Sequence, residues 1–92
     1  MEKNKIKTMS YSANKKSALN DLLPLNQRMS RIRSCAVLVC EKWKCHRAII
    51  LVQIGIKDSY AEDSYPTESE IKTAMEMLDK IKDTGPMPRI GQ

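Results

Sequence analysis

Phenylalanine is absent from this 92-residue chain, and the aromatic side chains are one Trp and three Tyr. A core must therefore be built mainly from Leu, Ile, Val and Met. The three glycines, at positions 55, 85 and 91, form no glycine-rich loop of the kind that cradles phosphate. The longest fully apolar run, residues 48–52, is far shorter than the ~20 residues that span a bilayer. These absences predict one small domain without a membrane segment.

Cysteine occurs three times, so the cysteines cannot all pair within one chain. The first ten residues lack the apolar run of a secretory signal. We therefore expect free thiols in a reducing compartment, and an intracellular, cytoplasmic protein.

A metal site is suggested by Cys35, Cys40, Cys45 and His46, which follow the pattern C-x4-C-x4-C-H. Structural zinc sites use closer pairs separated by a loop that lets the ligands converge. A spacing of five turns a helical side chain by about 140° and places neighbours in a strand on opposite faces. The sequence therefore predicts no metal and no cofactor. Because adjacent side chains diverge, Cys45 and His46 form no catalytic dyad, and we expect no enzymatic activity.

The domain boundaries follow from composition and from helix-breaking residues. Residues 1–14 are polar and Lys-rich, which predicts a flexible basic tail. We expect a single compact domain over residues 15–86 and a short C-terminal tail over residues 87–92. Within the domain, residues 16–23 predict a short helix, which Pro24 ends.

The middle of the chain has apolar residues at steps of three or four from Met29 to Trp43, which predicts a helix over residues 26–44. Residues 46–56 favour a second buried helix. The fold class is therefore mainly α, a small domain of three to four helices. The alternative is an α+β fold with a hairpin at 34–56, because β-branched residues are dense there.

The last helix has the clearest sequence signals. Thr67 and Glu70 fit a capping box, in which each residue satisfies a backbone amide of the other. Gly85 and Pro86 end the helix. One apolar face is predicted from five residues at helical spacing: Ile71, Ala74, Met75, Leu78 and Ile81.

Charge is divided unevenly along the chain. Residues 1–47 carry eleven Lys/Arg and three Asp/Glu, whereas residues 48–92 carry five and eight. The first half therefore indicates an anionic partner. Val37 and Leu38 point away from the apolar stripe, so we expect the middle of this helix to be surrounded and its ends to be basic and exposed. The candidate partner-binding residues are Arg28, Arg31, Arg33, Lys42, Lys44 and Arg47.

Residues 45–60, "CHRAIILVQIGIKDSY", have a basic start, an aliphatic run and a basic, Tyr-containing turn. In this they resemble the C-terminal domains of rhabdovirus phosphoproteins, as does the whole chain in its size, helical content and basic patch. The resemblance implies docking on a viral nucleoprotein–RNA complex, which helps to tether the polymerase to its template. The six basic residues named above are the contact candidates, selected by their charge.

Three functional hypotheses follow. The first is a non-enzymatic binding module whose basic face docks an acidic protein segment or a nucleoprotein–RNA complex. The second is a small nucleic-acid-binding regulator that uses the Lys tail and the same Arg/Lys patch, since phosphate contacts need no sequence motif. The third is self-association into a homodimer through residues 48–52 and the apolar face of the last helix.

Overall fold

The structure, a computed structural model, describes residues 10–61 and 63–86. In these residues the chain forms four helices and no strand: α1 (Tyr11–Ala18), α2 (Leu25–Trp43), α3 (Arg47–Ile54) and α4 (Glu68–Thr84). The prediction of a mainly α domain is confirmed. The alternative hairpin at 34–56 is wrong, because both halves of that segment are helical. Among the described helices, none combines the length and the apolarity of a membrane span.

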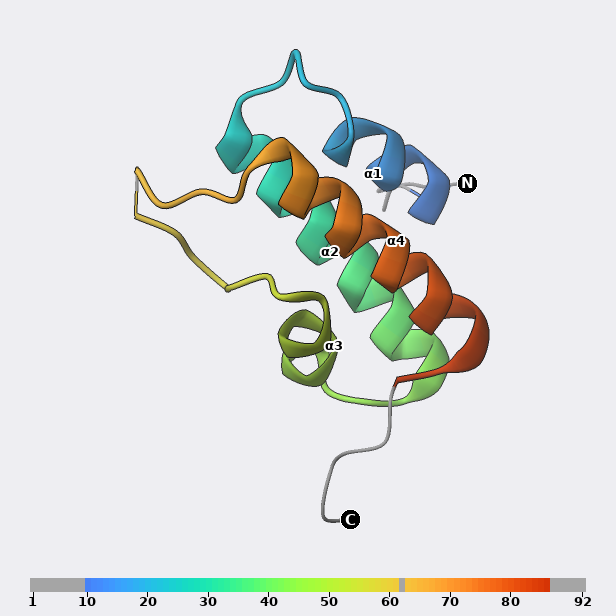
Figure 1. Ribbon diagram of the computed structural model, residues 1–92. Coiled ribbons are helices and arrows are strands. Elements are labelled where there is room, and N and C mark those ends of the chain that lie inside the picture. Colours follow the sequence, from blue (N-terminus) through green and yellow to red (C-terminus); the bar gives the residue numbers. More distant parts are fainter. Residues whose placement is uncertain (1–9, 62, 87–92) are drawn as a thin grey trace, which may run out of the picture.

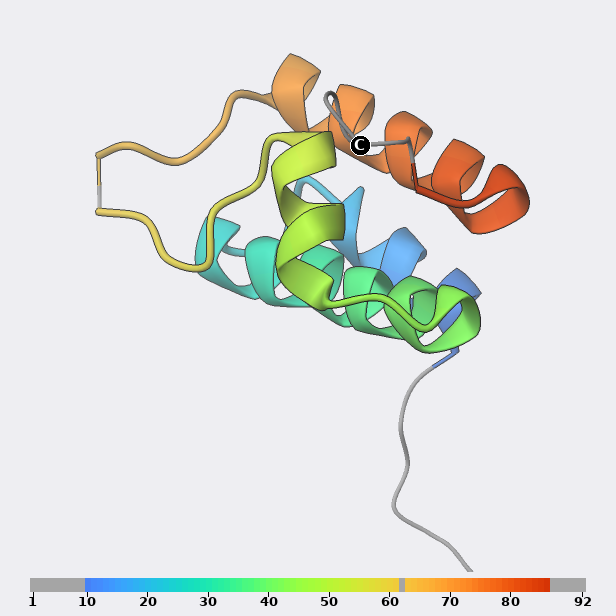
Figure 2. The same ribbon diagram turned by 90° about the horizontal axis from the view of Figure 1, so that it is seen from below.

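Helices α1, α2 and α4 lie side by side, and α3 crosses them steeply, so that Figure 1 views it nearly end-on. In Figure 2 the same helix stands between α2 and α4. Helices α2 and α4 run parallel, because contacts join their two starts and also their two ends. At the starts Arg28 binds Glu68, and at the ends the indole Nε1 of Trp43 donates to the carbonyl of Lys82 at 3.1 Å. Helix α3 and its flanking loops supply the crossover that a parallel pair requires.

Helix α1 runs antiparallel to both of these helices. Near its start the Tyr11 hydroxyl donates to Asp79 of α4 at 2.8 Å, and Lys15 forms an ion pair with the same carboxylate at 2.6 Å. At its end the carbonyl of Ala18 accepts from the Arg28 side chain, at the start of α2.

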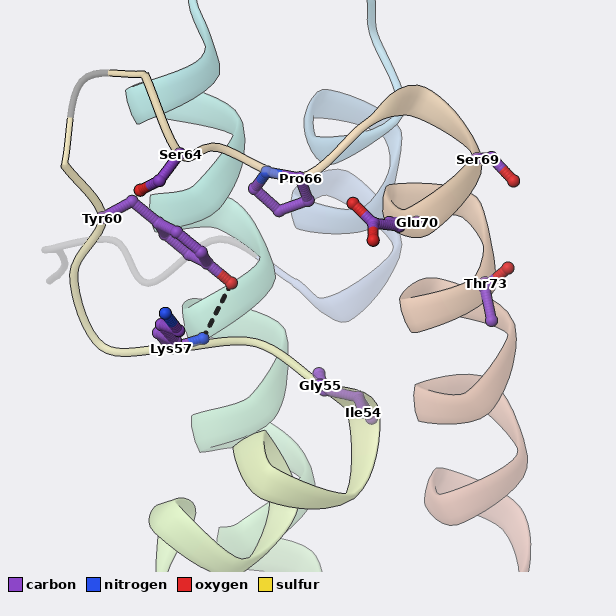
Figure 3. A pocket seen from close by; sticks show the side chains of 9 residues that line it. All are labelled: Ile54, Gly55, Lys57, Tyr60, Ser64, Pro66, Ser69, Glu70 and Thr73. Carbon is purple, nitrogen blue, oxygen red and sulfur yellow. Dashed lines mark hydrogen bonds between the residues drawn. The ribbon is translucent and has the colours of Figure 1, made fainter.

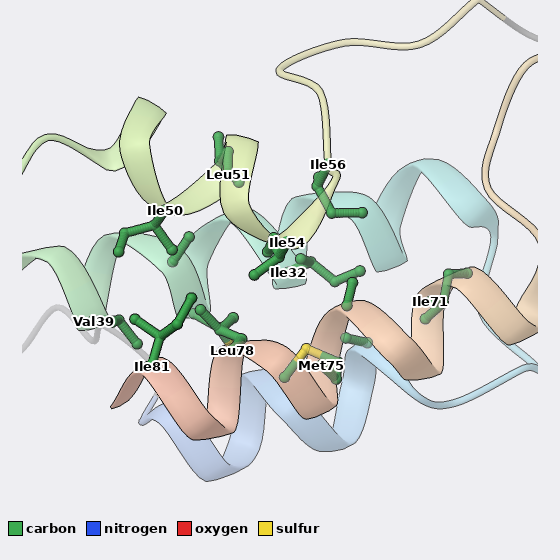
Figure 4. Packing of buried hydrophobic residues seen from close by; sticks show 14 of the residues in the cluster. Ile32, Val39, Ile50, Leu51, Ile54, Ile56, Ile71, Met75, Leu78 and Ile81 are labelled. Atoms are coloured by element: carbon green, nitrogen blue, oxygen red, sulfur yellow. The ribbon is translucent and has the colours of Figure 1, made fainter. Parts of the chain in front are cut away.

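The core lies where α3 meets α2 and α4 (Figure 4). Ile32 and Val39 of α2 point into it, as do Ile50 and Ile54 of α3. All five residues of the predicted apolar face of α4 are buried, so that face is used within the chain. The prediction that it mediates self-association is therefore wrong as it stands. Of residues 48–52, only Ala48 and Val52 are exposed.

The first helix begins earlier than predicted. The Ser10 hydroxyl accepts a hydrogen bond from the amide of Ala13 at 3.1 Å and so caps α1. Residues 11–14 are therefore helical rather than tail, and Asn14 is buried. Residues 19–23, predicted to be helical, form turns, in which Asn20 accepts from the amide of Leu22. Local capping thus shifts the helix by five residues toward the N-terminus. The other predicted tail residues, 1–9 and 87–92, lie outside the described residues.

The junction of α2 and α3 shows why two helices form there. Lys44 adopts the left-handed conformation (φ 58°), which ends α2. The Nδ1 of His46 then accepts from the amide of Ala48 at 3.1 Å and caps α3. Gly55, at φ 76°, ends α3 in the conformation that glycine adopts without strain. The helix predicted over residues 46–56 is confirmed.

The predicted capping box of α4 is also confirmed. The Thr67 hydroxyl accepts from the amide of Glu70 at 3.2 Å, and the Glu70 carboxylate accepts from the amide of Thr67 at 2.8 Å. At the other end Gly85 has a φ of 88° and lies against the Trp43 ring, where a Cβ would come within 3.3 Å of ring carbons. Glycine is therefore required both by the backbone and by the close packing.

Arg28 is buried, with only 2% of its surface exposed, so the prediction that it contacts a partner is corrected. Its Nε donates to the carbonyl of Ala18 at 2.9 Å, and its Nη2 donates to Glu68 at 2.9 Å. Its Nη1 binds the second oxygen of the same carboxylate. One side chain therefore joins the end of α1, the start of α2 and the start of α4.

Replacing Arg28 by lysine should destabilise the fold. Lysine keeps the charge but has a single nitrogen, which cannot reproduce the planar fork of donors. The buried carbonyl of Ala18 or the Glu68 carboxylate then loses its donor. We expect R28K to lower the free energy of unfolding by about 2 kcal/mol in urea denaturation. The matched control is R31K, one turn further along α2, for which a change below about 0.5 kcal/mol is expected. Equal effects of the two substitutions would contradict this role.

The Arg28–Glu68 pair should also make stability depend on pH. Hydrogen bonds from Arg28 lower the pKa of Glu68 below its ordinary value. A carboxyl whose pKa is lower in the folded state stabilises the protein above its unfolded pKa of about 4.3, and this stabilisation is lost as the pH falls through the folded pKa. The loss of stability caused by E68Q should therefore be larger at pH 6 than at pH 3. Urea denaturation at both values, with E76Q as a control on the exposed side of α4, measures this difference. A loss that is independent of pH would refute the linkage.

Candidate docking groove on α2

The six basic candidates do not form one face. Arg31 and Arg33 are two positions apart in a helix, so their side chains point about 200° apart. Arg28 lies inside the fold, as described above. The structure brings Arg33 and Arg47 together at one groove, and it places the other three elsewhere.

The groove runs along the side of α2 that no other described helix covers, and its volume is about 450 Å³. Val37 and Leu38 are half-buried there. The expectation that the middle of this helix is surrounded is therefore wrong. Helices α1, α3 and α4 pack on the other faces of α2 and leave this side uncovered. The groove is lined by residues of α2 and by the first residue of α3: Ser30, Arg33, Ser34, Val37, Leu38, Glu41 and Arg47.

The two arginines of the groove are both anchored by the segment that follows α3. The Nε of Arg33 donates to the carbonyl of Lys57 at 3.2 Å. The Nη2 of Arg47 binds the carboxylate of Asp58 at 2.7 Å. Two guanidinium groups from different helices are thus oriented by one short stretch of loop.

The Arg47–Asp58 ion pair is open to water, with 43% and 61% of the two side chains exposed. Exposed ion pairs of this kind contribute little to stability. Its geometric effect is larger, because it limits the rotamers of a long side chain and leaves the other guanidinium donors free for a second carboxylate. Glu41 is the one acidic residue that lines the groove.

This arrangement favours ligands with carboxylates next to an apolar side chain. Guanidinium groups bind carboxylates through two parallel hydrogen bonds. The half-buried side chains of Val37 and Leu38 line the same groove as the two arginines and form its apolar floor. A ligand that carries both carboxylates and an apolar group therefore matches the residues that line the groove.

Lys42 lies outside the groove. Its Nζ donates to the carbonyl of Lys82 at 2.7 Å, beside the indole of Trp43, which donates to the same oxygen. These contacts satisfy a carbonyl in the last turn of α4, where helices leave such groups without intrahelical partners. The hydrogen bond to Lys82 therefore gives Lys42 a structural role at the end of α4. Lys44 is exposed in the turn that ends α2, and Arg31 is half-buried on the flank of α2 away from Arg33.

A second hollow, of about 410 Å³, lies between the loop after α3 and the start of α4 (Figure 3). Two of its polar side chains, Tyr60 and Glu70, already serve the local structure. The Tyr60 hydroxyl accepts from the amide of Lys57 at 2.9 Å, and the Glu70 carboxylate belongs to the capping box. Tyr60 also packs against Tyr65, with the ring centroids 5.6 Å apart. Tyr60 and Glu70 are therefore engaged in contacts within the loop and at the start of α4.

Cys35 and His46 have different surroundings and different structural roles. Cys35 is fully buried, and burial raises the pKa of its thiol to about 12, which removes the thiolate needed for nucleophilic attack. His46 uses its Nδ1 to cap α3. In the described residues, no three or more His, Cys, Asp or Glu side chains are arranged to hold a metal ion.

The sequence interpretation did not identify Val37, Leu38 and Glu41 as residues that line a surface groove. Val37 and Leu38 were assigned to a surrounded part of the helix, although they lie off the apolar stripe. Their position off the stripe is the signal that identifies an outward face. The convergence of Arg33 and Arg47 had no signal in the sequence, because it depends on how α3 crosses α2.

Comparison with protein-family models, with curated proteins and with solved structures found no match to this chain. The geometry of its own residues is therefore the basis for assigning a function.

Proposed function

We propose that this chain is a non-enzymatic binding module, which docks an acidic protein segment in the groove on α2. The observation that carries the proposal is that Arg33 and Arg47 line one groove together with the half-buried Val37 and Leu38. The occupant is a segment that carries at least two carboxylates and one apolar side chain between them.

Charge around the groove supports an acidic occupant. Besides Arg33 and Arg47, Lys57 is exposed beside the groove, since its carbonyl accepts a hydrogen bond from Arg33. Complementary charge of this kind steers the encounter and fixes the register of the bound segment. The negative charge of Glu41 repels an acidic segment. It therefore selects against segments that would place a carboxylate beside Glu41.

The setting that we propose follows the resemblance to rhabdovirus phosphoproteins. There the acidic segment would belong to a nucleoprotein–RNA complex, and the module would help to tether a viral polymerase to its template. The proposed location is intracellular and cytoplasmic. The nucleic-acid-binding alternative depends largely on the Lys tail, most of which lies outside the described residues.

Binding of a labelled synthetic peptide tests this proposal. The probe is a short peptide in which two Glu–Glu pairs flank a leucine, and fluorescence anisotropy measures its dissociation constant. We expect R33E and R47E each to weaken binding at least tenfold, because each introduces a repulsive charge beside the bound carboxylates. E41Q should tighten binding, since it removes the one acidic side chain of the groove.

The matched control is K80E, which makes the same change of charge on the exposed side of α4, away from the groove. It should leave the dissociation constant within about twofold, because water and salt screen distant surface charges. A probe with serine in place of leucine should bind more weakly to the unchanged protein. Equal losses for K80E and R47E would refute the groove. Tighter, Arg47-dependent binding of a single-stranded RNA oligonucleotide would favour the nucleic-acid alternative instead.

A further inference from the structure

Cys40 and Cys45 are brought together by the way in which α2 ends. Cys40 lies in the last turn of the helix, and Cys45 follows the left-handed residue Lys44. The amides of Lys44 and Cys45 both donate to the carbonyl of Cys40, the latter at 3.1 Å. In this type of helix ending, the side chains at the positions of Cys40 and Cys45 commonly contact each other.

The backbone geometry limits how far apart these two residues can be. The hydrogen bond of 3.1 Å joins the Cys45 nitrogen to the Cys40 oxygen. With the standard bond lengths on either side, the two Cα atoms are at most about 7 Å apart. Disulfides span Cα separations of roughly 4.4–6.8 Å, so a bridge requires little or no movement of the backbone.

The surroundings of the two thiols also show that they lie close to each other. Both are half-buried and pack against the core, whereas Cys35 is fully buried. Burial is the largest cause of the raised pKa of Cys40, and the neighbouring Cys45 raises that pKa further. The second effect places the two sulfurs within electrostatic reach of each other.

We propose that Cys40 and Cys45 form a reversible intramolecular disulfide, a redox-sensitive site at the junction of α2 and α3. The oxidant that we assign is a low-molecular-weight disulfide such as glutathione disulfide. In reducing compartments, disulfides are usually transient and redox-sensing. The proposal is therefore consistent with free thiols as the resting state.

The reaction proceeds by two thiol–disulfide exchanges. The Cys45 thiolate attacks one sulfur of the oxidant, which forms a mixed disulfide and releases one glutathione thiolate. The Cys40 thiolate then attacks the Cys45 sulfur, which closes the protein disulfide and releases the second glutathione. The protein loses two hydrogens, and the oxidant is reduced to two thiols. We assign the first attack to Cys45, because its position after the helix end is less constrained than that of Cys40.

Mass spectrometry of the full chain after incubation with glutathione disulfide tests the proposal. Trypsin cleaves after Lys42 and Lys44, so the two cysteines fall on separate peptides, residues 34–42 and 45–47. We expect these peptides to be joined after oxidation, and the intact chain to lose about 2 Da without dimerising. The midpoint of thermal unfolding should rise by roughly 5 °C, and dithiothreitol should reverse the rise.

Cys35 shares a tryptic peptide with Cys40, so substitutions must separate them. The joined peptides should persist in C35A and be lost in C40S and C45S. Fragmentation of the joined peptides from the unchanged protein assigns the bridge independently, should C35A fail to fold. Three results would overturn the proposal: a bridge to Cys35, a glutathione adduct that does not convert to the internal disulfide, or a disulfide between two chains.

Discussion

The buried guanidinium of Arg28 is the interaction on which the arrangement of the helices depends. It is bonded to the carbonyl that ends α1 and to the carboxylate that begins α4, while its own backbone begins α2. A parallel pair of helices cannot be joined by a short turn, so α2 and α4 need a crossover and a contact that aligns their starts. Arg28 provides the contact, and α3 provides the crossover and fills the core between them.

The same contact removes Arg28 from the basic residues of the surface. With Arg28 inside and Lys42 bonded to the end of α4, the sequence cluster of positive charge is divided. What remains as a pair, Arg33 and Arg47, lies beside the one face of α2 that the other described helices leave open. The fold therefore places two of the basic residues of the first half of the chain in one groove, beside the apolar Val37 and Leu38. The proposed binding function depends on that placement.

Sequence patterns predicted most of the fold, because helix periodicity and capping are local properties. The capping box at Thr67 and the five apolar residues of α4 lie within a few turns of one another, and both were predicted correctly. The start of α1 was missed, since Ser10 was assigned to a tail. In the candidate groove, charge identified Arg33 and Arg47 but gave no reason to separate them from Arg28. Val37 and Leu38 were assigned to the interior, because the pattern did not reveal how many faces of α2 are covered.

The sequence by itself determined the capping box and the buried face of α4, and it favoured the helical class over the alternative hairpin at 34–56. These follow from interactions between residues close in the chain, such as the reciprocal hydrogen bonds of Thr67 and Glu70. Only the tertiary structure decided that Arg28 is buried and that Arg33 and Arg47 share a groove. The partner of Arg28 is 40 residues away in sequence, and Arg33 is anchored 24 residues away. Contacts over such distances depend on how whole helices pack, and a local pattern of residue types contains no record of them.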